Sequence, residues 1–168
     1  MSSQSEHLSA DGIPNMWMDP MIRGLMVGVV ACAISSAAFA QAQFGTAAEA
    51  KAMIERTASA LRADRGKALA AFNAGGGDFR DRDLYPFCAN AGDGEFTAHP
   101  ILVGKNMKDV VDKNGFRVGD EIRKVATEGT FNEVTYMWPR PGTDATPVQK
   151  VSFVTKVGDQ ICGVGYYK

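Results

Sequence analysis

Six residues in the second half of the chain are of the types that line a pocket for a small organic anion: Tyr85, Phe87, His99, Tyr136, Trp138 and Lys150. A buried carboxylate needs apolar walls that exclude water, one cation, and a few hydrogen-bond donors that replace its lost hydration. Trp138, Tyr136 and Phe87 could form the walls, with Lys150 as the cation. His99 and Tyr85 could donate the hydrogen bonds.

The spacing of these residues suits β-strands, in which alternate side chains point to the same face. Tyr85 therefore shares a face with Phe87, and Tyr136 shares one with Trp138. Each such pair can line one cavity. The candidate site thus depends on how several strands are arranged in a sheet.

Simpler interpretations exist for the same residues. A lysine in the middle of a strand, such as Lys150, is commonly exposed to solvent. His99 could merely end a strand and hydrogen-bond to the following loop. Tyr136 and Trp138 could pack in the core, as aromatic residues of a small domain often do. The residues alone leave these alternatives open.

The charges of the chain are balanced, with 18 Lys and Arg against 19 Asp and Glu, and no basic cluster is visible. We therefore expect no nucleic-acid partner. The alternating charges at residues 80–83 indicate a solvated, mutually paired surface, so Arg80 and Arg82 are left outside the candidate site. A composition of 45% hydrophobic and 22% charged residues is typical of a globular protein.

The most apolar stretch of the chain is residues 21–40, with Arg23 near its start and an A-x-A site at residues 38–40. A positive region, an apolar region and a small-residue site in this order are typical of a signal peptide. We expect cleavage near Ala40 and a periplasmic or secreted product.

This interpretation divides the chain into a mis-assigned or disordered leader at residues 1–20, the signal peptide, and one domain at residues 41–168. The apolar stretch is also nearly long enough to be an uncleaved membrane anchor. Lipidation at Cys32 is another alternative. The Gly, Ser and Ala content of the stretch favours cleavage.

Removal of the first 40 residues leaves Cys88, Cys162 and His99 as the remaining cysteines and histidine. In an oxidising compartment an even pair of cysteines indicates a disulfide first. The spacing of these residues does not resemble that of a metal site, so we expect no metal or cofactor.

No G-x-S-x-G or phosphate-binding glycine loop is present, which favours binding over catalysis. The enzyme alternative would use His99 as a base, with Cys88 as a nucleophile if its thiol is free.

The elements that must position these side chains begin with a helix. Thr46 and Glu49 form a capping box, in which each side chain bonds a free backbone amide at the helix start. Apolar residues at helical spacing then extend the prediction to about residue 73, with Gly66 as a mild defect and the glycines at 75–77 as the end.

Beyond the glycines the pattern changes to that of strands, separated by turns and by a long crossover at residues 100–129. The crossover contains a short amphipathic segment at residues 107–111 and a helix near residues 119–127. The strands are expected at residues 84–89, 95–99, 132–138, 148–157 and 160–167. Five strands flanked by helices indicate an α+β domain.

The ordered motifs of this chain resemble those of a single Cache domain, an extracytoplasmic sensor fold related to PAS. After the long helix, the resemblance is carried by Leu84-Tyr85-Pro86-Phe87, Asp93-Gly94, Ala98-His99-Pro100, Gly104-Lys105, Asp112, Asn114-Gly115, Tyr136-Met137-Trp138-Pro139, Lys150-Val151-Ser152-Phe153 and Gly163-Val164-Gly165-Tyr166. It covers about the whole of residues 41–168.

The resemblance implies a long helix on one face of a five-stranded antiparallel sheet and a ligand pocket between the other face and the crossover. It also implies that the first and last strands are neighbours, which makes a disulfide between Cys88 and Cys162 plausible. Members of the family are mostly sensing parts of chemoreceptors and kinases, and several similar domains bind short-chain carboxylates.

The resemblance therefore implies a binding protein for a small organic acid rather than an enzyme. Since the chain stops after the last strand, we expect signalling through a membrane receptor or kinase partner. A homodimer through the N-terminal helix is also implied. The competing hypothesis is a structural or interaction protein with a vestigial pocket.

Overall fold

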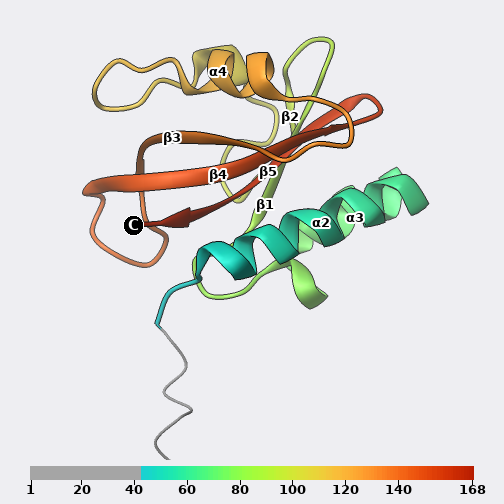
Figure 1. Ribbon diagram of the computed structural model, residues 1–168, viewed down its shortest axis with the longest axis horizontal. Coiled ribbons are helices and arrows are strands. Elements are labelled where there is room, and N and C mark those ends of the chain that lie inside the picture. Colours follow the sequence, from blue (N-terminus) through green and yellow to red (C-terminus); the bar gives the residue numbers. More distant parts are fainter. Residues whose placement is uncertain (1–42) are drawn as a thin grey trace, which may run out of the picture. The chain divides into compact units, whose positions relative to one another are not determined.

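The computed structural model describes residues 43–168 of the chain (Figure 1). The expectations for the leader, the signal peptide or anchor, and Cys32 lie outside the described residues. No helix in the described range has the length and apolarity that a bilayer span requires. The helices are α2 (Ala47–Ala63), α3 (Arg65–Ala74) and α4 (Val118–Val125), with 3-10 turns η1 (Gly77–Phe79) and η2 (Met107–Asp109).

The N-terminal helical segment begins as the capping box predicts. The Thr46 hydroxyl accepts a hydrogen bond from the Glu49 amide at 3.3 Å, and the Glu49 carboxylate accepts one from the Thr46 amide at 2.7 Å. The prediction of one continuous helix is wrong at Asp64, whose extended backbone separates α2 from α3. The Asp64 carboxylate accepts a hydrogen bond from the Lys67 amide at 3.0 Å, so this residue ends one helix and caps the next.

Five strands form one antiparallel sheet in the order β2-β1-β5-β4-β3. This arrangement confirms the predicted sheet and the adjacency of the first and last strands. Pro86 begins the first strand, where its missing amide proton costs no ladder hydrogen bond. The strands are β1 (Pro86–Asn90), β2 (Phe96–Ala98), β3 (Asn132–Pro139), β4 (Pro147–Val157) and β5 (Gln160–Tyr167).

The sheet has a core on each face. Helices α2 and α3 cover one face, and α4 with the crossover covers the other (Figure 1). The helix-side core contains Met53, Ile54, Leu61, Phe72, Leu84, Phe153 and Val164. The crossover-side core contains Phe87, Phe96, Met107, Ile122, Val134, Tyr136 and Ile161. The predicted apolar stripe of the N-terminal helical segment therefore packs against the sheet in the helix-side core.

The crossover is held to the sheet by close backbone approach and by one carboxylate. A Cβ atom at Gly119 would overlap with the Met107 carbonyl, so glycine lets α4 start against η2. Asp112 accepts hydrogen bonds from the amides of Asn114 at 2.8 Å, Phe116 at 3.0 Å and Met137 at 3.0 Å. Because Met137 lies on the edge strand β3, Asp112 joins the crossover to that edge.

Candidate ligand-binding site

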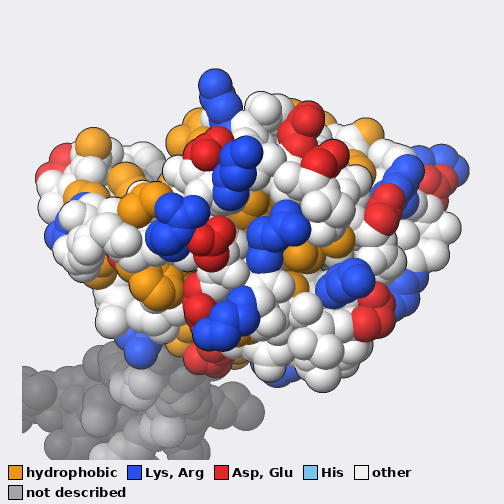
Figure 2. Space-filling model, turned by 90° about the horizontal axis from the view of Figure 1, so that it is seen from above, with side chains coloured by type: hydrophobic (Ala, Val, Ile, Leu, Met, Phe, Trp, Pro, Cys, Tyr) orange, Lys and Arg blue, Asp and Glu red, His pale blue; other side chains and the backbone are white. Residues whose placement is uncertain are grey.

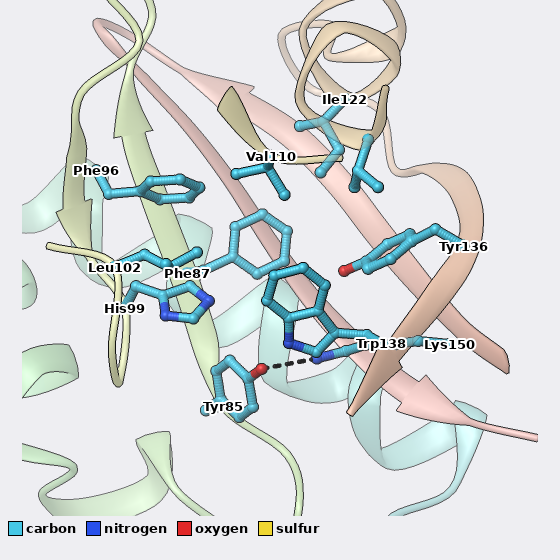
Figure 3. Close-up of a pocket in the computed structure, with 11 residues that line it drawn as sticks. Tyr85, Phe87, Phe96, His99, Leu102, Val110, Ile122, Tyr136, Trp138 and Lys150 are labelled. Carbon is cyan, nitrogen blue, oxygen red and sulfur yellow. Dashed lines mark hydrogen bonds between the residues drawn. The ribbon is translucent and has the colours of Figure 1, made fainter. Parts of the chain in front are cut away.

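A small cavity lies between the sheet and the crossover, and we call it the inner cavity (Figure 3). Its volume is about 20 Å³, room for about one water molecule. All six residues of the sequence-derived set line it. The described residues that line it are Tyr85, Phe87, Phe96, His99, Leu102, Val110, Val118, Ile122, Tyr136, Trp138 and Lys150.

Lys150 brings a positive charge into this apolar lining. Its side chain is only 1% exposed, so the interpretation of Lys150 as a solvent-facing residue is wrong. Lys150 Nζ donates a hydrogen bond to the Tyr85 hydroxyl at 3.0 Å, and lies 4.2 Å from the Tyr85 ring centroid and 4.9 Å from that of Tyr167. Within residues 43–168, no acidic side chain forms an ion pair with it. The ammonium is thus stabilised by aromatic faces and one hydroxyl.

His99 follows the short strand β2 and bonds to the following loop, as the simpler interpretation of this residue expects. Its Nδ1 accepts a hydrogen bond from the Ile101 amide at 3.1 Å, which holds the following loop. Burial and, to a lesser degree, the charge of Lys150 lower the pKa of His99 to about 3. The imidazole is therefore neutral at pH 7, and the proton must be on Nε2. His99 can offer that N–H to a ligand.

Tyr136 completes the polar part of the inner cavity. Its hydroxyl is 2.9 Å from the Ser152 hydroxyl, and its ring meets the Trp138 ring edge-on at a centroid distance of 6.1 Å. Burial and the nearby Tyr85 raise the pKa of Tyr136, while the hydrogen bond with Ser152 opposes this. The phenol is therefore a neutral group that can donate a hydrogen bond.

A larger cavity of about 250 Å³ adjoins the inner one, and we call it the outer cavity. Tyr85, His99 and Trp138 line both, so these three side chains form the partition between them. The remaining lining residues of the outer cavity are Arg80, Pro100, Ile101, Pro139, Arg140 and Pro141.

Sequence reasoning missed several lining residues. They are Phe96 on β2, and Leu102, Val110, Val118 and Ile122, which form the apolar wall on the crossover side. The amphipathic segment at 107–111 and the helix near 119–127 could have indicated these residues, because the apolar faces of both segments have to cover the sheet. No sequence pattern pointed to Arg140, which lies in the loop after β3.

The residues of the enzyme alternative are not arranged for catalysis. Cys88 and Cys162 face each other on β1 and β5 and form a disulfide, which leaves neither as a free nucleophile. The disulfide belongs to the helix-side core, on the opposite face of the sheet from the inner cavity. His99 has its Nδ1 lone pair occupied and a pKa far below 7, so it is a poor general base. In the part of the chain that the structure describes, no group of three or more metal-binding side chains occurs.

The family of this chain is shown by comparison with known proteins. The profile of the family described as single Cache domain 2 matches residues 27–166. The chain belongs to this family. A comparison with curated proteins yielded no significant match.

Solved structures of Cache-type sensor domains share the fold. A methyl-accepting chemotaxis protein from Vibrio parahaemolyticus RIMD 2210633 has a TM-score of 0.57 and 21% identity, over 89% of this chain and 97% of that one. A periplasmic sensor domain of a chemotaxis protein has a TM-score of 0.53 and 22% identity, over 89% and 99%. A Cache chemosensory domain described in terms of carboxylic acid recognition has a TM-score of 0.50 and 19% identity, over 88% and 95%.

Proposed function

We propose that this Cache domain is an extracytoplasmic sensor module that binds a short-chain carboxylate at the inner cavity, without chemical turnover. The observation that carries the proposal is the buried ammonium of Lys150, which lacks an acidic partner among the described residues. The bound carboxylate would accept hydrogen bonds from Lys150, from His99 Nε2 and from the Tyr136 hydroxyl.

The energetics of burial support this assignment. An isolated buried charge costs several kcal/mol, and the attraction of an opposite charge offsets this cost in a site of low dielectric. Among residues 43–168, the contacts of the Lys150 ammonium in the free protein are aromatic faces and the Tyr85 hydroxyl. A carboxylate would supply the missing charge. Carboxylic acid recognition in a protein of the same fold agrees with this choice of ligand.

The small volume of the inner cavity limits how the ligand enters. A cavity of about 20 Å³ admits a carboxylate only if a lining side chain moves. Trp138 is half-buried and borders both cavities, which makes it the side chain best placed to move. The same small volume favours the second candidate function, an interaction protein whose pocket is filled by its own side chains.

A thermal-shift screen of the purified protein with acetate, propionate, pyruvate and lactate tests the proposal. A ligand at 100 times its Kd should stabilise the fold by about 2.7 kcal/mol. Lys150→Met should abolish the shift while leaving the free protein at least as stable, because it removes a buried charge at similar volume. Lys156→Met, on the same strand but outside the cavity lining, is the matched control. No shift with any acid would favour the second candidate.

The cellular setting completes the proposal. We propose export with cleavage near Ala40, and readout of ligand binding by a membrane receptor or kinase, with a homodimer through α2 as one means of coupling. N-terminal sequencing of protein recovered from a periplasmic fraction tests the cleavage. An N-terminus before residue 21 in a membrane fraction would instead indicate the anchor at residues 21–40.

A further inference from the structure

The outer cavity carries positive charge, and none of its lining residues in the described range 43–168 is acidic. Arg80 and Arg140 both line it, whereas its other described lining residues are aromatic, proline or aliphatic. The His99 imidazole, which also lines it, is neutral at pH 7. Among the described residues, the two cavities together are lined by three cationic side chains. This contrasts with the surface above α4 and the crossover, where Lys and Arg alternate with Asp and Glu (Figure 2).

Arg140 is held in a fixed position at the outer cavity. Its side chain is 17% exposed, and its Cζ lies 3.8 Å from the Phe44 ring centroid and 5.0 Å from that of Tyr167. Its Nε lies 3.3 Å from Asp83 Oδ2, but neither atom makes a hydrogen bond within the part of the chain that the structure describes. Asp83 Oδ1 instead accepts a hydrogen bond from the Gly45 amide at 2.7 Å. The guanidinium therefore keeps N–H donors for a further acceptor.

Arg140 is also close to Lys150. Lys150 Nζ lies 4.9 Å, and Arg140 Cζ 5.0 Å, from the centroid of the same Tyr167 ring. The two cationic centres are therefore at most about 10 Å apart. With a charge-assisted hydrogen bond of about 2.8 Å at each end, this upper bound limits a ligand that bridges the two cations to a short carbon chain between its acidic groups.

Arg80 adds a second positive charge at the solvent side of the outer cavity. Its side chain is exposed, and no ion pair with it occurs in residues 43–168. Asp83 compensates part of the charge of Arg140, so Arg80 gives the outer cavity its net positive charge. The sequence analysis left Arg80 outside the candidate site, whereas the structure places it in the lining of the outer cavity.

We propose that the outer cavity binds a second anionic group of the ligand, so that the preferred ligand is a short dicarboxylate. One carboxylate contacts Lys150 in the inner cavity. The other reaches Arg140 and Arg80 past Trp138, which must turn aside because it forms part of the partition. This proposal rests on the proposed function, since it assigns the first carboxylate to the inner cavity.

Calorimetric titration with matched acids tests the proposal. Butyrate and succinate have the same carbon count and differ in the second carboxylate, and propionate with malonate form a shorter pair. A charge-assisted hydrogen bond at the outer cavity should make each diacid bind about tenfold more tightly than its monoacid. The affinity for the diacid should also fall more steeply with added salt.

Variants of the outer cavity separate its role from that of the inner one. Arg80→Gln, at an exposed site, should weaken succinate binding several-fold and leave butyrate unchanged. The double variant Asp83→Asn with Arg140→Gln removes both partners of the buried pair, and should likewise weaken succinate binding several-fold and leave butyrate unchanged. Arg62→Gln, exposed on α2, is the matched control.

The outcomes distinguish this proposal from the proposed function. Butyrate that binds as tightly as succinate, or a succinate affinity unchanged in Arg80→Gln and in the double variant, would overturn the second anionic contact. Monocarboxylate binding at Lys150 would then stand alone. Absence of binding by every monoacid and diacid would overturn both.

Discussion

The side chain of Lys150 lies directly over Gly165 of the neighbouring strand β5. A Cβ atom at this glycine would overlap with Lys150 Cε and with the Ser152 hydroxyl. At Gly163, two residues earlier on the same face, a Cβ atom would likewise overlap with the Phe87 ring. The Gly-x-Gly spacing of β5 therefore makes space for the cation and one wall of the inner cavity.

Gly165→Ala should displace the Lys150 side chain and weaken carboxylate binding by about tenfold or more. Overpacking of a close-packed site should also lower the free energy of unfolding by about 1–3 kcal/mol. Calorimetric titration and urea unfolding measure the two effects. The control is Gly76→Ala, because no atom lies within 4 Å of that added Cβ and the backbone φ is −88°. Unchanged binding in Gly165→Ala would show that Lys150 is not the contact.

The buried imidazole of His99 should make stability depend on pH. In the unfolded chain a histidine takes up its proton near pH 6.5, whereas folded His99 stays neutral down to about pH 3. The unfolded state therefore binds more protons between these values, and stability must fall as the pH is lowered through this range. From pH 7 to pH 5 the loss attributable to His99 should be about 2 kcal/mol.

Urea unfolding of the wild type and of His99→Gln at pH 7 and pH 5 measures this loss. The variant should have lost most of the pH dependence, since glutamine does not titrate. Glu49 adds little between pH 7 and pH 5, because both its ordinary pKa of 4.5 and its folded pKa of about 2, which the amide and hydroxyl of Thr46 and the guanidinium of Arg82 lower, lie below this window. An equally large pH effect in the variant would contradict the assignment to His99.

The disulfide between Cys88 and Cys162 should contribute much of the stability of the domain. It closes a loop of 74 residues, for which the chain-entropy model gives about 4 kcal/mol. Reductant should therefore lower the Tm of the wild type strongly, and the double variant Cys88→Ala with Cys162→Ala should have the lowered Tm without reductant. Detection of two free thiols in the native oxidised protein would contradict the bond.

The sequence predicts the sheet well because its signals are local. Alternation and turn glycines define the strands, and each expected strand occurs within about two residues of its predicted bounds. The break at Asp64 was not predicted, since the apolar stripe continues through it and only the capping bond to Lys67 favours an interruption. The strand order came from the family resemblance, as periodicity does not say which strands are neighbours.

In the candidate site too, local patterns predict some residues, whereas contacts distant in sequence determine the others. Alternation places Tyr85 with Phe87 and Tyr136 with Trp138, and the structure brings these pairs to one cavity. Arg140 could not be predicted in this way, because its position depends on Phe44 and Asp83, distant in sequence. The burial of Lys150 likewise depends on the ring of Tyr167 at the far end of the chain.

The two sides of the inner cavity contribute different kinds of residue. The strands β3 and β4 and the segment leading into β1 supply its lysine and tyrosines, whereas the crossover and α4 supply aliphatic side chains such as Val110 and Ile122. Substitutions in the crossover should therefore change the size of ligand accepted without removing the polar groups that we propose to bind an acid.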